Sequence, residues 1–273
     1  IYGARGANGV IMVTTKKGKE GRTQVNYSTY AGWSNLPKKI DLLSAADYTA
    51  QRASLGLAAD NKGATTDWQD QIFRQAFTQS HNLSFGGGTK NSTYRASFGY
   101  MDQEGIIKKS GMEKYNGRLN ISTKALNDKL TIEGGLTVAR TNDQRAPLGE
   151  TGGVEGDLLL AALKLNPTYP VYNTDGSFYQ LTDQVRNPLA MIELTNDNTQ
   201  TDRILANISA QLNIWKGLSY KVNLSYDENK ASRKVTQDAK LSYMSDKGTA
   251  YISNVEQGSQ SIENLLYYNF NLG

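Results

Sequence analysis

Apolar and polar residues alternate one by one in several segments of this 273-residue chain. In Thr93–Met101, for example, Tyr94, Ala96, Phe98 and Tyr100 are separated by small or polar residues. Successive side chains of a β-strand point to opposite faces, so a period of two predicts a strand with one apolar and one polar face. The pattern occurs in these segments: Arg22–Trp33, Ser80–Gly87, Thr93–Met101, Lys114–Lys124, Leu130–Arg140, Arg203–Ile214, Leu218–Asp227 and Ser261–Leu272.

The connections between these segments alternate in length. Tight turns are expected at Gly86–Asn91, Leu126–Lys129 and Trp215–Gly217, whereas Asn35–Gln79 and Thr141–Asp202 are long. Outer-membrane barrels join antiparallel strands by short periplasmic turns and longer extracellular loops. The chain is therefore predicted to be all-β, an antiparallel transmembrane β-barrel segment of about eight strands of about 9–12 residues each.

The long connections contain shorter patterns of a different period. Apolar residues of Leu42–Gln51, Asp67–Phe77 and Asp157–Leu165 are spaced as on one side of a helix. Either Ser44 or Asp41 is a suitable N-cap for the first of them. We expect short helices here, in the extracellular loops. Strand extensions are also expected around Leu241–Ser253, inside a long connection over Glu228–Ser261.

Composition excludes several classes of function. Hydrophobic residues make up 38% of the chain, its mean hydropathy is −0.55, and no window reaches 18 uninterrupted apolar residues. With one histidine and no cysteine, the chain lacks the residues of most transition-metal sites and of a Cys–His catalytic pair. A net charge of +4 against 30 basic and 26 acidic residues gives no basic run of the kind that binds nucleic acid. No catalytic residue, metal site or cofactor is predicted, and an enzyme is the least supported class.

The first eighteen residues, IYGARGANGVIMVTTKKG, differ from the rest. Gly3, Gly6 and Gly9 recur every three residues, and glycine is the residue for tight backbone approach or positive φ. The run Val10–Val13 then reads as a short strand buried on both faces. Lys16 and the residues after it return the chain to water.

This stretch resembles the segment that closes the plug domain of SusC/RagA-type TonB-linked outer-membrane transporters. The signature residues that carry the resemblance are Tyr2, Gly3, Arg5, Gly6, Asn8 and Gly9. A second stretch, HNLSFGGGTKNSTYRASFGYMDQEGI over His81–Ile106, resembles an early barrel hairpin of that family. The resemblance implies that residues 1–20 end the plug domain and that residues 21–273 begin a barrel of about 22 strands. The chain is then a fragment of a longer protein.

The family resemblance also implies a function and partners. Such transporters import oligosaccharides or peptides across the bacterial outer membrane, and TonB, which contacts a segment upstream of this one, supplies the energy. They work with a SusD-like surface lipoprotein, commonly as a dimer of transporter–lipoprotein pairs within the lipid bilayer. We expect this multi-pass localisation and these partners here, and we expect no nucleic acid among them.

Candidate residues for substrate contact follow from alternation and loop position. Polar residues opposite the apolar face are expected to line the barrel lumen: Arg95, Arg118, Asn120, Asn207 and Asn223. Aromatic residues of the long loop Thr141–Asp202 are candidates for contact with substrate or partner: Tyr169, Tyr172 and Tyr179. The alternative for these aromatics is that they form a small core of the loop itself.

Two alternative functions remain at this point. One is a TonB-dependent receptor for siderophores or cobalamin, which the residues 2–18 signature disfavours. The other is a soluble β-sandwich that binds carbohydrate, which would show two packed sheets with Greek-key connections.

Overall fold

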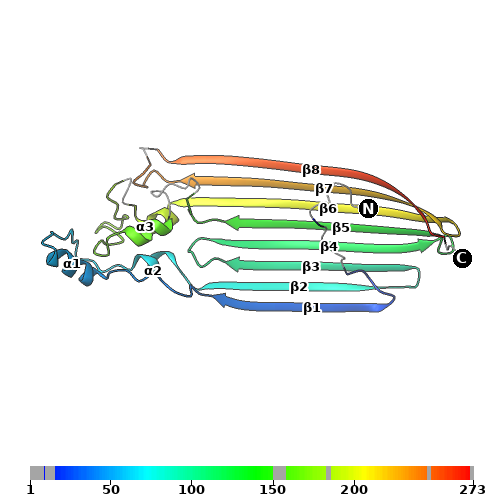
Figure 1. Cartoon of the computed structure of the whole chain (residues 1–273), viewed down its shortest axis with the longest axis horizontal. Helices are drawn as coiled ribbons and strands as arrows, with labels where there is room; N and C mark the ends of the chain where they lie inside the picture. The colour runs from blue at the N-terminus through cyan, green and yellow to red at the C-terminus, as the bar shows by residue number, and fades with distance from the viewer. Residues whose placement is uncertain (1–8, 10–15, 150–157, 183–185, 245–246, 271–273) are drawn as a thin grey trace.

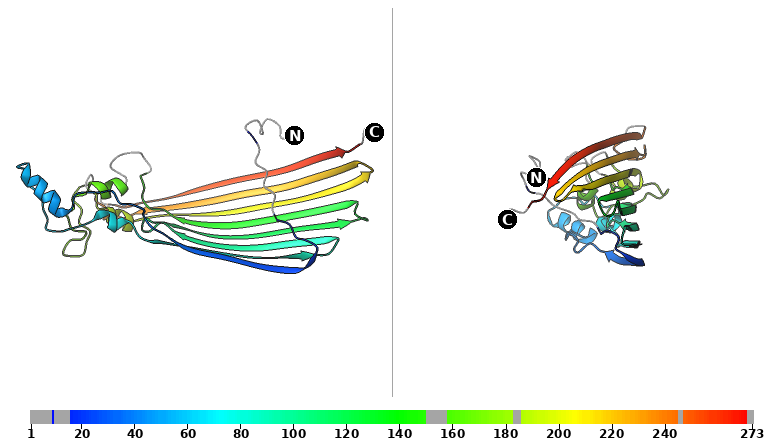
Figure 2. Two further views of the ribbon diagram at one scale, coloured as in Figure 1. Left: turned by 60° about the horizontal axis from the view of Figure 1, so that its bottom comes forward. Right: turned by 90° about the vertical axis from the view of Figure 1, so that its right-hand side faces the viewer.

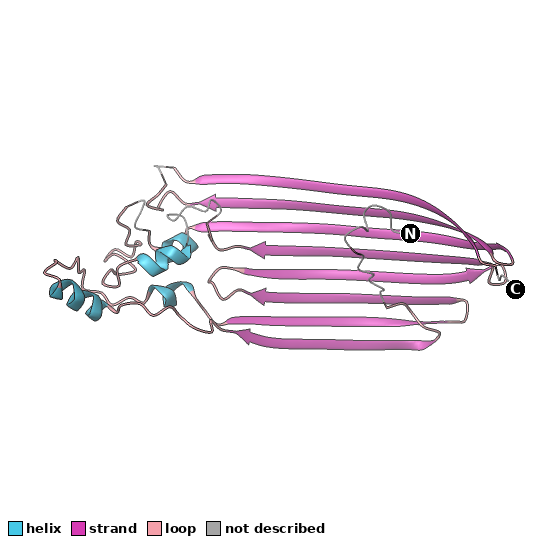
Figure 3. Cartoon of the chain, viewed as in Figure 1, coloured by secondary structure: helices cyan, strands magenta, loops and turns pink. Residues whose placement is uncertain are grey.

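In the computed structural model, residues 9, 16–149, 158–182, 186–244 and 247–270 are described. Eight strands form one sheet, and each strand pairs with the next one along the chain. The sheet is long and carries the helices at one end (Figure 1, Figure 3). The strands are β1 (Gly21–Ser34), β2 (Ala76–Gly88), β3 (Ser92–Glu104), β4 (Gly111–Ala125), β5 (Leu130–Gln144), β6 (Thr195–Trp215), β7 (Leu218–Gln237) and β8 (Thr249–Tyr268).

The expected architecture of about eight sequential antiparallel strands is confirmed. A sandwich would divide its strands between two packed sheets, whereas the strands described here share a single sheet in the order β1 to β8. The strand predicted at Val10–Val13 lies outside the described residues. Within the described residues, no helix has the length and hydropathy that a membrane crossing requires.

The sequence also predicts correctly which connections are tight. Three short turns join β2 to β3, β4 to β5 and β6 to β7, all at the end of the sheet opposite the helices (Figure 2). Gly217 has φ of +82° in one of these turns, a conformation that glycine adopts without strain. Leu126, Asn127 and Asp128 take positive φ in another, where Asn and Asp are the residues best suited to it.

The strands are longer than predicted, and one connection was placed wrongly. They run from 13 to 21 residues rather than about 9–12. The predicted connection Glu228–Ser261 is largely strand, because β7 continues to Gln237 and β8 begins at Thr249. The extension expected around Leu241–Ser253 is strand only from Thr249 onward. The extension of β7, residues 228–237, is mainly polar on both faces, so hydropathy gives no sign of it. Backbone pairing continues there, and Arg233 crosses to Asp197 with Nη2–Oδ2 at 2.6 Å.

The four helices of the described residues lie beyond the end of the sheet that is opposite the three short turns. The helix predicted over Asp67–Phe77 is shorter than expected, because the chain becomes strand at Ala76. The helix at residues 188–193 was not predicted. It begins after Asn187, whose side chain accepts from the backbone of Leu189 and Ala190, and proline follows at its first position. The helices are α1 (Ala45–Ser54), α2 (Trp68–Ile72), α3 (Leu158–Lys164) and α4 (Pro188–Glu193).

These helices and their described connections, residues 35–75, 145–149, 158–182 and 186–194, are called the loop cap here. Its interior is a hydrophobic cluster built from three of the helices and the chain between them. Ile72 is 0% exposed at its centre. The buried members are Trp68, Ile72, Leu158, Ala162, Leu165, Tyr169, Met191 and Ile192. Two loops separated by the four strands β2 to β5 are thus joined into one small folded unit.

Replacing Ile72 by alanine tests this unit in the full-length protein. A buried Ile→Ala change leaves a cavity and costs about 2–5 kcal/mol, so the loop cap should open more often. Hydrogen exchange of backbone amides in residues 158–182 is expected to accelerate, while amides of β3 and β4 keep their protection. Ile40→Ala is the matched control, because Ile40 is 57% exposed in the same loop. Equal exchange in both variants would contradict a shared core.

Candidate functional site

Strand pairing gives the sheet two faces of opposite chemistry. Cross-strand partners share a face, so the register carries one row of side chains across the whole sheet. One such row is Leu83, Phe98, Gly117, Val138 and Ile204, which is apolar throughout. Large side chains of this apolar face stay exposed on every strand: Val25, Leu83, Phe98, Leu119, Leu136, Ile208, Leu224 and Ile262. Nothing in the described chain covers them.

The apolar face is bounded toward the loop cap by an oblique edge. Pairing places Thr29 of β1 and Glu256 of β8 in one cross-sheet row. Trp33 lies four residues past Thr29 toward the cap, whereas the main apolar stretch of β8 on this face stops at Ile262, six residues short of Glu256. Ile252 of β8 lies nearer the cap on the same face, but it is separated from that stretch by Asn254, Glu256, Gly258 and Gln260. The edge therefore moves ten residues along the strands, at about 3.3 Å per residue, while it crosses seven strand spacings of about 4.8 Å. These two distances are nearly equal, so the strands are inclined by about 45° to a level apolar band.

The opposite face carries all five polar candidates. Arg95, Asn120 and Asn207 lie in a single cross-sheet row, with Gly135 between the two asparagines. Arg118 lies one row closer to the cap and Asn223 one row farther from it. Arg95 donates to Ser84 Oγ at 2.9 Å, and Asn223 donates to Glu263 Oε2 at 3.2 Å. Alternation thus identified a contiguous polar surface over β3 to β7.

Gly135 creates room within this polar surface. A Cβ atom there would lie 2.4 Å from Asn207 Oδ1 and 3.4 Å from Asn120 Oδ1. The two amide groups therefore converge over a position with no side chain. Beside them, the Arg118 Nε atom is buried and has no hydrogen-bond partner in the described part of the chain. A buried donor of this kind favours an acceptor supplied by a group outside the described residues.

Residues just before β1 lie against the polar face. Lys17 Nζ is 2.6 Å from Glu133 Oε1 on β5. A Cβ atom on Gly18 would come within 2.3 Å of the Tyr94 carbonyl oxygen, so only glycine allows this approach to the β3 backbone. The chain that leads into β1 therefore crosses the polar side of the sheet. Sequence reasoning marked Gly18 only as part of a family signature and did not find its contact.

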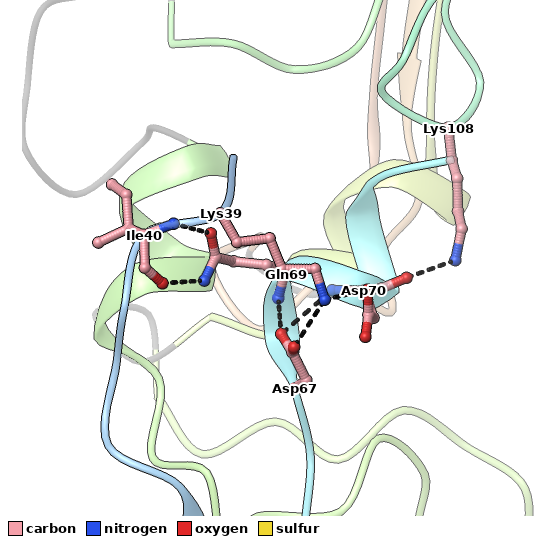
Figure 4. A network of polar contacts seen from close by, with 6 residues as sticks. All are labelled: Lys39, Ile40, Asp67, Gln69, Asp70 and Lys108. Atoms are coloured by element: carbon pink, nitrogen blue, oxygen red, sulfur yellow. Dashed lines mark hydrogen bonds and ion pairs between the residues drawn. The ribbon is translucent and has the colours of Figure 1, made fainter. Parts of the chain in front are cut away.

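A network of polar contacts joins the start of the first loop, at Lys39 and Ile40, to helix α2 (Figure 4). Asp67 caps α2, because its carboxylate accepts from the backbone N–H groups of Gln69 and Asp70. The side chain of Gln69 exchanges two hydrogen bonds with the backbone of Ile40, at 3.0 and 2.8 Å. Lys39 pairs with both Asp67 and Asp70, and this raises the pKa of the lysine.

Tyr169, a loop candidate for ligand contact, lies inside the cap. Its ring is 7% exposed, and its hydroxyl donates to Asp60 Oδ2 at 2.5 Å. Burial, reinforced by the Asp60 carboxylate, raises the pKa of Tyr169 to about 12. The Lys62 ammonium, 2.8 Å away, and the Tyr169 hydroxyl lower the pKa of Asp60.

The other two loop tyrosines differ in exposure. Tyr179 packs against the hydrophobic cluster, with its ring centroid 5.4 Å from that of Tyr169. Tyr172 is 48% exposed and stacks on Phe178 across a small hairpin whose turn is at residues 173–177. The alternative that the loop aromatics form a local core therefore describes Tyr169 and Tyr179, and Tyr172 alone presents a ring to solvent.

Among the described residues, no three His, Cys, Asp or Glu side chains gather closely enough to hold a metal ion. His81 lies on the apolar face of β2, and the Tyr27 hydroxyl is 2.6 Å from its Nδ1 atom. Most signature residues of the resemblance (Tyr2, Gly3, Arg5, Gly6 and Asn8) lie outside the described residues.

Comparison with known proteins identifies the family. No family model matches the sequence. The chain is 34% identical over 235 residues to the TonB-dependent receptor SusC of Bacteroides thetaiotaomicron, covering 76% of this chain and 23% of that protein. It is 32% identical to the TonB-dependent receptor P3 of Formosa agariphila, covering 100% of this chain and 28% of that protein. The chain belongs to the SusC/RagA-type TonB-dependent receptors.

Solved structures agree on the fold of this SusC/RagA-type chain. The structure of the RagAB peptide transporter superposes with a TM-score of 0.82 at 22% identity, over 100% of this chain and 36% of that one. The 'closed-closed' state of the RagAB peptide importer gives a TM-score of 0.79 at the same identity. The SusC/RagA-type chain spans about a quarter of the length of the curated relatives named above. Its eight strands are thus part of a larger barrel.

An acid-sensitivity test examines the Asp60 contact in the loop cap of this SusC/RagA-type receptor. Folding lowers the pKa of Asp60 below its ordinary value of 3.8. The stability that the Asp60 carboxylate contributes to the folded protein is therefore intact above pH 3.8, and it is lost as the pH falls through the pKa of the folded state. Pepsin cleavage within residues 158–182 of the full-length protein should therefore rise below about pH 4.

Asp60→Asn should remove most of this pH dependence, because the amide does not titrate. Asp128→Asn, in a turn at the far end of the sheet, is the control and should keep the wild-type profile. An unchanged profile in Asp60→Asn would show that the Asp60 contact does not hold the cap.

Proposed function

We propose that the full-length protein is a TonB-dependent transporter of the bacterial outer membrane that imports oligosaccharides or peptides. The observation that carries the proposal is the exposed apolar face with its oblique edge. Strands of outer-membrane barrels tilt by about 35–45°, and a level hydrocarbon layer would meet such strands along the slant between Trp33 and Ile262. The apolar face then contacts lipid, and the loop cap lies outside the cell.

The polar face would line the lumen under this proposal. Arg95, Arg118, Asn120, Asn207 and Asn223 are then the lumen-facing groups, available to plug or substrate. The contacts of Lys17 and Gly18 on this face support a division in which residues 1–20 end a plug domain and residues 21–273 begin a barrel of about 22 strands. The plug would thus enter the lumen directly ahead of β1.

The proposed partners follow from the relatives. SusC is named a TonB-dependent receptor, and RagAB is named a peptide importer. We infer that this protein works with TonB and with a SusD-like surface lipoprotein, and a dimer of such pairs is the assembly to test. The lipoprotein would contact the loop cap, where Tyr172 offers an exposed ring.

Electrophoresis of the full-length protein without boiling tests the proposal. Extracted from outer membranes in detergent, a closed barrel should migrate anomalously unless it is boiled, and a lipoprotein should copurify. The two outcomes are separable: absence of the mobility shift would overturn the barrel, while a shift without a copurifying partner would overturn only the pairing. Uptake of oligosaccharides or peptides by cells carrying the gene, with and without TonB, then tests the activity.

A further inference from the structure

Two hollows adjoin on the apolar face of the sheet, and their chemistry differs. The first, of about 950 Å³, lies over Gly117, where the missing side chain leaves space between Phe98 and Val138. Leu83 and Ile204 extend its apolar lining. Its size is within the range of small-molecule sites.

The second hollow, of about 820 Å³, begins one row closer to the loop cap. The first hollow ends at Tyr100, Tyr115, Arg140 and Asp202, which form one cross-sheet row. The next row on the same face, Asp102, Glu113, Asn142 and Gln200, lines the second. Hydrogen bonds join the two rows, from the Tyr115 hydroxyl to Glu113 at 2.6 Å and from Gln200 to Asp202 at 3.1 Å. The hollows therefore lie end to end on the same face, and together they are called the groove here, apolar at one end and polar at the other.

The charges of the polar end are balanced. The cations that line this end are Arg74, Lys109 and Lys234, and the carboxylates on the same face of the sheet are Asp102, Glu104 and Glu113. A fourth carboxylate, Asp143, occupies a strand position on the opposite face. Arg74 is paired with Glu104, and Lys109 donates to backbone carbonyls of residues 193 and 195. A phosphate headgroup would find no net positive charge here. The remaining lining on this face consists mainly of amides and hydroxyls: Ser110, Asn142, Gln144, Asn198, Gln200 and Ser232.

We propose that this groove binds a sugar-headed lipid of the outer leaflet. Its acyl chain would lie over Gly117 against Leu83, Phe98 and Val138, and its sugar hydroxyls would bond to Asn142, Gln200 and neighbouring amides. The proposal rests on the proposed membrane orientation, which puts the apolar face in lipid and the polar end of the groove at the outer surface. Because the groove is on the outer side, closure of the barrel by further strands leaves it open.

Native mass spectrometry of the full-length protein tests this. The protein is held in lauryldimethylamine oxide and titrated with monoglucosyl-diacylglycerol or with phosphatidylglycerol of the same acyl chains. Wild type should bind the glucosyl lipid in preference to the phospholipid. Gly117→Leu fills the apolar end of the groove, so a few CH₂ groups of the acyl chain lose their contact with the protein. Binding of the glucosyl lipid should therefore weaken about tenfold.

Gly134→Leu is the matched control, because Gly134 lies on the same face but outside the groove. A Cβ atom would meet a neighbouring side chain at 3.1 Å there and at 3.3 Å at Gly117, so the two changes impose similar crowding. The control should bind lipid like wild type. Replacing Asn142 and Gln200 together by alanine should remove the preference for the glucosyl lipid while leaving chain binding.

The outcomes separate this proposal from the proposed function. Anomalous migration before boiling shows that each variant is a folded barrel. If folded Gly117→Leu binds the glucosyl lipid as tightly as Gly134→Leu, the groove is not the site. If wild type prefers phosphatidylglycerol, the sugar-headed ligand is wrong. If wild type itself shows no anomalous migration, the proposed function fails first, and the lipid site fails with it.

Discussion

Backbone hydrogen bonding between neighbouring strands is the interaction on which this molecule depends. The sheet has no buried interior of its own, since one face is apolar and exposed and the other is polar. The hydrophobic cluster of the described chain lies in the loop cap, beyond the strand ends. Seven ladders of antiparallel pairing, from β1·β2 to β7·β8, therefore hold the strands in register. Each ladder satisfies backbone groups that a hydrocarbon environment would otherwise leave without partners.

The register in turn decides what each face can do. A shift of one residue in any ladder would move apolar side chains to the polar face and break the rows that cross the sheet. Three cross-strand arginine–aspartate ion pairs help to fix it: Arg140 with Asp202, Arg203 with Asp227, and Arg233 with Asp197. Only the last is largely shielded from solvent, so it is the pair whose loss would leave a charge poorly hydrated. The groove on the apolar face and the polar surface on the opposite face both depend on this alignment.

The sequence predicts those parts of the fold that a period of two encodes. Strand order, the tight turns and the shared face of Arg95, Arg118, Asn120, Asn207 and Asn223 all follow from alternation. The ends of the strands do not, because residues 195–202 and 228–237 are polar on both faces and their pairing is a property of the neighbouring strand. Long-range contacts such as that of Asp60 with Tyr169 leave no local pattern either. Gly117 and Gly135 gave no signal in the sequence, since a glycine's role there is set by what lies opposite.

The crossing of the polar face just ahead of β1 has a mechanical consequence. Residues 16–20 are held by few contacts, including one largely exposed ion pair, and such a pair contributes about 0–1 kcal/mol. β1, by contrast, is paired with β2 along nearly its whole length. A force applied to the N-terminal side would peel residues 16–20 from the sheet one contact at a time. The same force would then reach β1 along its own axis, where all its hydrogen bonds share the load. Residues 16–20 would therefore detach up to the start of β1, and the pairing of β1 with β2 would resist further extraction and leave the sheet intact.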